Sequence, residues 1–194
     1  MMAMRKIAVF CGARFGTRER YVEVARELGM LFARTDCGLV YGGGRVGLMG
    51  VVAQACLDHG GHVTGVIPHF LNTRELLHPG LQNLHTTSDL FERKSMMMAI
   101  ADAFIALPGG IGTFDELLEV MAWRQLRRID KPIALLDVDG YFRPWLAALE
   151  HSVTEGFLDP LELDRLIIDA RPATVLEALL GACDAHAHAG NGEG

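Results

Sequence analysis

The sequence predicts an α/β fold, in which a doubly wound, Rossmann-like parallel sheet carries helices on both faces. Three observations predict it. Short apolar, β-branched runs alternate along the chain with longer segments of helical period, which is the pattern of a parallel sheet wrapped by helices. The runs are continuously apolar, so each strand should be covered on both of its faces. Glycine-rich turns follow three of the runs, as they do where a strand leads into a ligand-binding helix.

The individual elements follow from this alternation in chain order. Apolar runs predict strands at residues 6–11, 38–41, 62–67, 83–86, 103–107 and 132–136, and a weaker one at 166–169. Helical spacing of apolar residues predicts helices at 18–35, 46–59, 89–101, 113–126, 141–154 and 173–182. Residues 68–81 form the longest connection without clear periodicity. A loop of this length is often functional, so a lid over a ligand is one role open to it.

Length and composition favour one domain. At 194 residues, half of them apolar, the chain can bury one good core. No internal repeat and no linker rich in Pro, Gly or Ser divides it. We therefore expect a single α/β domain at residues 1–183. Residues 184–194 are small, polar and rich in glycine, which predicts a disordered tail.

The net charge and the cysteines limit which partners and which cellular compartment we expect. The formal net charge of −6 argues against a nucleic-acid partner or an anionic membrane surface, because both demand a basic face. The apolar run at residues 7–11 is too short for a signal peptide or a membrane span. The four cysteines show no C-x-x-C spacing, which is typical of reduced, buried thiols. We expect a cytoplasmic protein.

Three glycine-rich turns, at residues 11–16, 41–50 and 108–113, follow strands and should meet at one edge of the sheet. Glycine lets the backbone approach an anion closely, and the next helix directs free N–H groups at it. Each turn alone could instead need glycine for positive φ angles. Together they favour a nucleotide-binding domain, with Gly12, Gly43 and Gly44 as candidate phosphate contacts. None of the turns has the G-x-G-x-x-G spacing, with an acidic residue at the right distance, that marks a dinucleotide site.

The third turn reads Pro-Gly-Gly-Ile-Gly-Thr-Phe-Asp-Glu at residues 108–116, and here the sequence resembles a known family. P-G-G-x-G-T-x-x-E is the signature of the LOG (Lonely Guy) family of cytokinin-activating nucleoside 5'-monophosphate phosphoribohydrolases. The resemblance extends to residues 41–44, 47–50, 65–68 and 92–94, and it covers roughly residues 6–136. Two departures bear on base specificity. Ala13 and Arg14 stand where many members have serines, and Phe91 replaces a common histidine.

The resemblance implies a role for each matching residue. Glu116 and Arg93 take the catalytic positions, and Lys94 joins the substrate-binding residues. The turn that holds the 5'-phosphate comprises Gly109, Gly110, Gly112 and Thr113. The resemblance further implies a homodimer with active sites near the subunit interface. Its small-molecule partner is a nucleoside 5'-monophosphate, and the reaction needs no metal or organic cofactor.

Without the family, Glu116 and Arg93 have plainer explanations. Thr113 followed by Glu116 is also a capping box, which satisfies free N–H groups at a helix start. Against this, the apolar residues that follow form a different face of the helix and leave Glu116 beside the phosphate turn. Arg93 could be a solvated surface arginine. Its functional role requires its helix to start at the same sheet edge, so that the guanidinium faces Glu116.

The predicted reaction is hydrolysis of the N-glycosidic bond to a free base and ribose 5-phosphate. It passes through an oxocarbenium-like ribose, which a carboxylate such as Glu116 stabilises or assists by deprotonating water. Two alternatives stay open. A pyridoxal-phosphate decarboxylase needs a Schiff-base lysine, for which Lys94 is the serious candidate. A nucleotide-binding or carrier protein needs the glycine turns but not the pair of Glu116 and Arg93.

Overall fold

Seven strands form one parallel sheet in the computed structural model, which describes residues 4–35, 37–74 and 76–190. The order across the sheet is β4-β3-β2-β1-β5-β6-β7, and every neighbouring pair is parallel. The bounds are β1 Lys6–Phe10, β2 Gly38–Tyr41, β3 Val63–Pro68, β4 Asn83–Thr87, β5 Ala103–Ala106, β6 Ile133–Leu136 and β7 Leu166–Asp169. The predicted fold class is confirmed.

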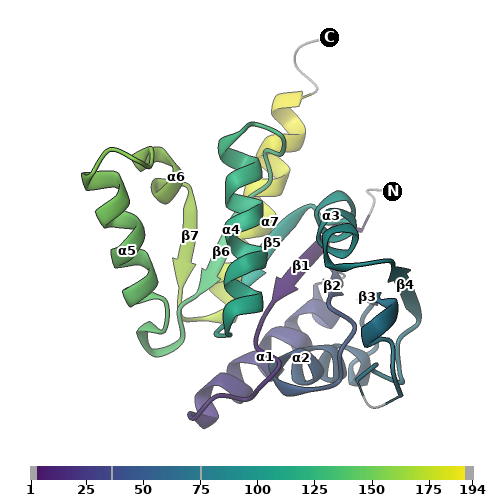
Figure 1. Cartoon of the computed structure of the whole chain (residues 1–194). Coiled ribbons are helices and arrows are strands. Elements are labelled where there is room, and N and C mark those ends of the chain that lie inside the picture. Colours follow the sequence, from purple (N-terminus) through teal and green to yellow (C-terminus); the bar gives the residue numbers. More distant parts are fainter. Residues whose placement is uncertain (1–3, 36, 75, 191–194) are drawn as a thin grey trace.

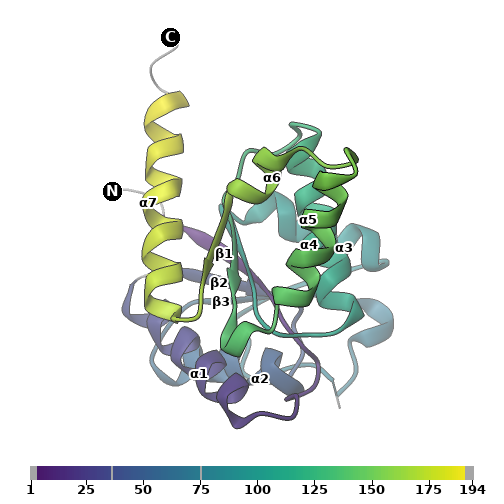
Figure 2. The same cartoon turned by 90° about the vertical axis from the view of Figure 1, so that its left-hand side faces the viewer.

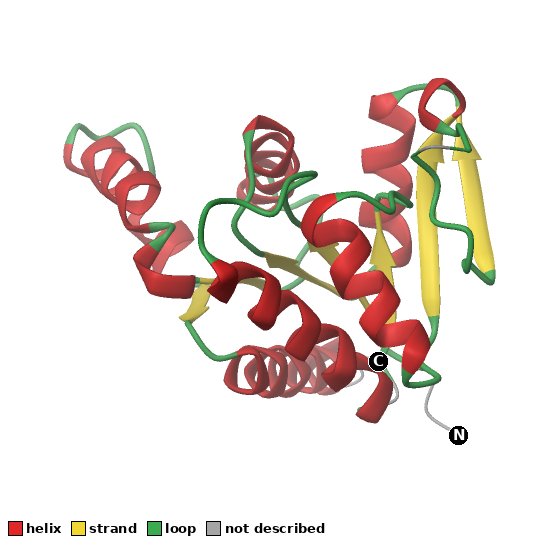
Figure 3. Cartoon of the chain, turned by 90° about the horizontal axis from the view of Figure 1, so that it is seen from below, coloured by secondary structure: helices red, strands yellow, loops and turns green. Residues whose placement is uncertain are grey.

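Helices cover both faces of this sheet (Figures 1 and 3). The bounds are α1 Glu19–Arg34, α2 Gly47–Asp58, α3 Leu90–Ile100, α4 Ile111–Gln125, α5 Arg143–Thr154, α6 Pro160–Asp164 and α7 Pro172–Gly190, with short 3-10 turns η1 His69–Leu71 and η2 Val138–Gly140. Figure 2 shows α1 and α7 on one side of the strands and α4 and α5 on the other.

The two faces make two hydrophobic cores, and the period of the strands explains the division. Successive side chains of a strand point to opposite faces. In β1, Ile7 and Val9 therefore belong to the core under α1, α2 and α7, whereas Ala8 and Phe10 belong to the core under α3, α4 and α5. All four are buried, which is why the strand reads as a continuous apolar run rather than an alternating one.

The strand order places a ligand site between β1 and β5. The chain winds outward from β1 through β2, β3 and β4, and then returns to the other side of β1 with β5. In open parallel sheets, ligands bind beyond the carboxyl ends of the strands at this switch point. The turns after β1 and β5 are neighbours there, because the Gly12 N–H donates to the Pro108 carbonyl at 3.1 Å.

The boundaries agree with the predicted ones to within two residues, except at the last helix. Helix α7 continues to Gly190, eight residues beyond the predicted end at Ala182, so most of the predicted disordered tail is helical. Alanine has the highest helix propensity, and it recurs at Ala182, Ala185, Ala187 and Ala189. That preference outweighs the small, polar composition. Residues 191–194 lie outside the described part of the chain.

The sequence did not predict helix α6 or the two 3-10 turns, which are too short to show a period. Within the described ranges, none of the helices combines the length and the apolar character that crossing a membrane requires.

Candidate active site

A cavity of about 690 Å³ opens at the carboxyl ends of β1 and β5. The turn after β1 and the turn after β5 form two of its walls, and the start of α2 forms a third. Single residues from other elements complete it: Tyr21 of α1, Leu71 of η1, Arg93 of α3 and Tyr141. The predicted site residues that line this cavity are Gly12, Arg93, Gly109, Gly110, Gly112, Thr113 and Glu116.

Gly12 connects the three walls of the cavity through its backbone hydrogen bonds. Its N–H donates to Pro108, and its carbonyl accepts from the N–H groups of Leu48 at 2.9 Å and Met49 at 3.4 Å. The free donors at the start of α2 are therefore used inside the protein. Of the two helix starts at the cavity, α4 is thus the one whose first N–H groups remain suited to an external anion.

The start of α4 has the geometry of an anion site rather than of a capping box. The helix begins at Ile111, with Gly110 as its N-cap and no side-chain cap hydrogen bond, so the alternative of a Thr113–Glu116 capping box is wrong. A Cβ added to Gly110 or Gly112 would meet no atom within 4 Å, and neither residue has a positive φ. Packing and backbone conformation therefore do not require these glycines, whereas close approach of a ligand would.

Gly109 is a glycine for a different reason. A Cβ at this position would lie 2.0 Å from Thr113 Oγ1, so the side chain of Thr113 occupies the space. Thr113 itself is only 3% exposed. The packing of the Thr113 side chain against Gly109 therefore fixes the inner side of the turn, whereas the space next to Gly110 and Gly112 is open.

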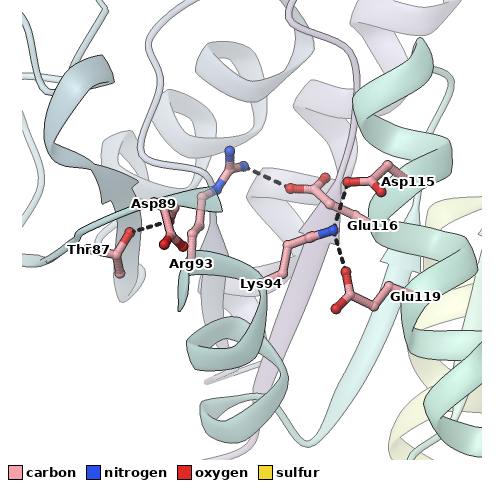
Figure 4. A network of polar contacts seen from close by, with 7 residues as sticks. All are labelled: Thr87, Asp89, Arg93, Lys94, Asp115, Glu116 and Glu119. Atoms are coloured by element: carbon pink, nitrogen blue, oxygen red, sulfur yellow. Dashed lines mark hydrogen bonds and ion pairs between the residues drawn. The ribbon is translucent and has the colours of Figure 1, made fainter. Parts of the chain in front are cut away.

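Arg93 and Glu116 meet at the cavity wall (Figure 4). Arg93 Nη2 donates to Glu116 Oε1 at 2.8 Å, and the two side chains are only 13% and 12% exposed. The expected arrangement, in which the helix of Arg93 starts at the sheet edge and its guanidinium faces Glu116, is what the structure contains. Arg93 Nε is also buried and has no partner among the described residues. Buried donors without a partner are rare outside functional sites.

The chain around Arg93 fixes the start of α3. Asp89 is the N-cap, and its carboxylate accepts from the N–H of Glu92 at 2.8 Å. Glu92 in turn accepts from the Ser88 N–H at 2.6 Å, and Thr87 Oγ1 donates to the Asp89 carbonyl at 3.0 Å. This reciprocal capping holds the first turn of the helix, and so holds the backbone from which Arg93 projects.

Burial sets the protonation of the two titratable groups next to Arg93. It raises the pKa of the Glu116 carboxyl to about 7, although the Arg93 guanidinium lowers it. Burial also raises the pKa of the Cys11 thiol well above its ordinary value, with a smaller contribution from Glu116. Cys11 lines the cavity as a neutral thiol, which is a poor nucleophile. Glu116 is the group that titrates near neutral pH.

Lys94 does not line the cavity. Its ammonium pairs with Asp115 at 2.9 Å and with Glu119, and these contacts link α3 to α4 (Figure 4). Burial lowers the pKa of Lys94, but hydrogen bonds to Glu119 and Asp115 outweigh this effect and raise it. The structure therefore gives Lys94 a helix-linking position, whereas the sequence predicted a substrate contact.

Gly43 and Gly44 also lie away from the cavity lining. The segment after η1 covers them, because the His78 N–H donates to the Gly43 carbonyl at 3.0 Å and the Arg45 N–H donates to Leu76 at 2.8 Å. This part of the predicted lid is thus pinned to the second glycine turn. Gly43 has a φ of 75°, so the plainer explanation of a glycine required by the backbone holds for it.

Tyr141 is a site residue that the sequence prediction missed. It follows β6 and lines the cavity, and its hydroxyl donates to the Gly109 carbonyl. Its ring packs between those of Tyr21 and Phe114. The residues after β6 lie at the same sheet edge as the glycine turns, and this position is the sequence signal for Tyr141.

A second cavity, of about 460 Å³, lies over the outer side of α2. Arg26, Arg45, Asp58, His59 and His78 contribute its polar lining, and it contains none of the predicted catalytic residues.

Comparison with known families finds a match over residues 49–179 to the family described as "Possible lysine decarboxylase". Curated relatives carry a different description. A cytokinin riboside 5'-monophosphate phosphoribohydrolase of Rhodococcoides fascians is 46% identical over 165 residues, which are 84% of this chain and 83% of that protein. One from Arabidopsis thaliana is 45% identical over 172 residues, which are 89% of this chain and 80% of that protein.

Solved structures with a similar fold include a molybdenum cofactor binding protein from Rippkaea orientalis, with a TM-score of 0.72 and 20% identity, covering 94% of this chain and 99% of that one. The Moco carrier protein of Chlamydomonas reinhardtii aligns with a TM-score of 0.70 and 19% identity, covering 95% and 99%. At this level of identity the likeness extends to the fold alone.

Proposed function

We infer the function from one premise: the chain belongs to the LOG family of cytokinin riboside 5'-monophosphate phosphoribohydrolases. It is a hydrolase that cleaves the N-glycosidic bond of a nucleoside 5'-monophosphate. Water attacks C1' of the ribose, the bond from C1' to the base nitrogen breaks, and its electron pair leaves with the base. The products are the free base and ribose 5-phosphate.

The 5'-phosphate binds at the start of α4 in this proposal. Gly110 and Gly112 leave open space there, and the first N–H groups of the helix point outward with the positive end of its dipole. Thr113 lines the same wall. An anchor at this end supplies binding energy that positions the sugar at the other end of the cavity.

Glu116 acts on the ribose, one helical turn beyond the phosphate site. Its carboxylate stabilises the positive charge that develops at C1' and accepts a proton from the attacking water. Arg93 holds that carboxylate through the 2.8 Å hydrogen bond and keeps part of its population ionised despite burial. The main support for the proposed function is that Arg93, Glu116 and the open glycine turn line the same cavity.

The direct test is to incubate the protein with AMP and with isopentenyladenosine 5'-monophosphate, and to identify the products by chromatography. The proposal predicts free base and ribose 5-phosphate in equal amounts. Nucleoside and inorganic phosphate instead would identify a phosphatase and overturn it. The comparison of the two substrates also decides the base. We propose the cytokinin-type base, because Leu48, Met49 and Leu71 give the cavity an apolar wall.

A pyridoxal-phosphate enzyme with the lysine decarboxylase activity that the family description names fits the site poorly. A Schiff base forms from a neutral lysine amine that reaches the cofactor. Lys94 is a charged link between α3 and α4, and Lys131 donates to the Met98 carbonyl at 2.7 Å. Lys6 starts β1, at the edge of the sheet opposite the cavity. Incubation with pyridoxal phosphate should leave no absorbance band on the protein after dialysis.

The carrier alternative would use the same fold and glycine turns for binding alone. It does not account for a buried carboxylate paired with an arginine in the cavity wall. Catalytic turnover of substrate in excess over protein excludes a pure carrier, whereas saturable binding without product would favour one.

We further propose a cytoplasmic homodimer. All four cysteines are free and buried, as expected in a reducing compartment. Several apolar side chains of α3 and α4 are exposed: Phe91 at 74%, Leu118 at 45% and, directly after α4, Leu126 at 70%. A second copy that covers these side chains would remove them from water. Sedimentation should give a dimer for the natural protein and a monomer for Phe91→Asp combined with Leu126→Glu.

A further inference from the structure

Gly42 follows β2 directly and lies under the guanidinium of Arg93. A Cβ added to Gly42 would be 2.3 Å from Arg93 Nη2 and 3.1 Å from Arg93 Cζ. The next atom, Met49 Sδ, is 3.4 Å away, which is an ordinary contact. The side chain of Arg93 is therefore the group that occupies the space where any other residue would place its Cβ.

The backbone gives no other reason for glycine at this position. Gly42 is not among the glycines with positive φ, unlike its neighbour Gly43 at 75°. Gly44, the third glycine of the run, would place a Cβ 3.2 Å from the end of the Met49 side chain. Of the three, Gly42 is the one whose missing side chain makes room for Arg93.

The displaced atom would be the one that contacts Glu116. Arg93 Nη2 donates the 2.8 Å hydrogen bond to Glu116 Oε1, and the same Nη2 would be closest to the new Cβ. Real Cβ atoms do not approach other atoms to 2.3 Å, so the guanidinium would have to move. Because it is the far end of a flexible side chain, it can move without disturbing the fold.

We propose that Gly42 is a positioning residue of the active site, whose missing side chain leaves the space in which the Arg93 guanidinium lies and from which it holds the Glu116 carboxylate. This inference rests on the proposed function, in which Glu116 acts on the ribose. The glycines of the phosphate turn are proposed to lie against the substrate. Gly42 differs from them, because it acts through Arg93 and does not contact the substrate.

The test compares Gly42→Ala with Gly38→Ala. Gly38 opens the same strand at its other end, and a Cβ there would meet Lys6 and Met4 side chains at 3.3 Å, far from Arg93. Both variants should melt close to the natural protein. The kcat for AMP should fall about 100-fold in Gly42→Ala, the scale expected for misplacing a catalytic group by about 1 Å, and should stay unchanged in Gly38→Ala.

A mutant cycle separates an effect through Arg93 from a general disturbance. If Gly42 acts through Arg93, Gly42→Ala should cost less than about twofold further in kcat once Arg93→Ala is present, because coupled changes are not additive. An equal loss in both backgrounds would overturn the positioning role. So would full activity of Gly42→Ala when Arg93→Ala is inactive, a result that leaves the proposed function intact.

The protonation of Glu116 gives a readout that needs no turnover. The charged groups around this carboxyl are Arg93 and Lys94 on α3 and Asp115 and Glu119 on α4, and the neutral Cys11 thiol lies nearby. Moving the guanidinium away should raise the pKa of Glu116. The NMR signal of the carboxyl carbon, recorded against pH, measures this pKa, and the loss of the signal in Glu116→Gln assigns it. An unshifted pKa in Gly42→Ala would overturn the inference. If the natural protein cleaves no nucleotide and the pKa of Glu116 still rises in Gly42→Ala, the proposed function alone is overturned.

Discussion

Arg93 Nη2 and Glu116 Oε1, 23 residues apart in sequence, are joined by a 2.8 Å hydrogen bond between the starts of α3 and α4. Both helices begin at the carboxyl edge of the sheet, one after β4 and the other after β5. The ion pair is nearly buried, yet it lies in the wall of an open cavity. A buried ion pair contributes little net stability by itself, so its position favours a chemical role.

Glu116→Gln should abolish most of the activity while the fold persists. The amide oxygen can still accept from Arg93, but it cannot take a proton from water or offset positive charge on the ribose. We expect kcat to fall at least about 100-fold, the lower end for loss of a general base. Release of free base measures the activity, and circular dichroism melting measures the fold. Turnover near that of the natural protein would reduce Glu116 to a structural partner of Arg93.

The activity should rise with pH through the pKa of Glu116, at about 7. The mechanism uses the ionised carboxylate, and burial keeps this carboxyl protonated at acid pH. A plot of kcat against pH should therefore show an acid limb with its midpoint near 7 rather than near 4.5, the ordinary value for glutamate. A flat profile between pH 5 and 8 contradicts this role for the carboxylate.

The same pKa predicts how stability depends on pH. Because the folded-state pKa is raised, the native protein binds more protons than the unfolded chain between pH 4.5 and about 7. The free energy of unfolding should then fall as pH rises across this window, by about 3 kcal/mol at most. Urea titrations of the natural protein and of Glu116→Gln isolate the effect, since the variant lacks the titrating group. An equal pH dependence in both proteins would mean that folding does not raise the pKa of Glu116.

Gly112→Ala should separate ligand binding from folding. The added methyl group has open space and lies in the first turn of α4, so the helix should gain up to about 1 kcal/mol of stability. The same methyl group occupies the path of the phosphate, and KM for AMP should rise about tenfold or more. Gly181→Ala is the matched control, because its Cβ also meets no atom within 4 Å and it lies in α7, away from the cavity. If both variants keep the natural KM, the phosphate binds elsewhere.

Much of this architecture could be predicted because buried parallel strands leave a local signature. The run from Ile7 to Phe10 is apolar on both faces, and glycine-rich turns precede α1, α2 and α4. The sheet-edge rule then brings residues 12, 93, 109–113 and 116 to one place without any knowledge of side-chain contacts.

What could not be predicted depends on side-chain direction and on contacts distant in sequence. Arg93 and Lys94 are adjacent in sequence, yet one faces the cavity and the other pairs with Asp115. The cover over Gly43 and Gly44 depends on backbone bonds from residues 76–78, which no local pattern indicates. The role of Gly42 likewise appears only once the position of the Arg93 guanidinium is known.

The central claim is that a phosphate anchor at the start of α4 positions a ribose for Glu116, and one comparison tests it most directly. The specificity constant kcat/KM is measured for AMP and for adenosine with the same enzyme, by release of free adenine. Losing the charge-assisted hydrogen bonds to the phosphate should cost adenosine at least about 100-fold. A large preference for AMP, carried partly by kcat, is the predicted result; equal specificity constants for the two substrates would contradict the phosphate-anchored mechanism.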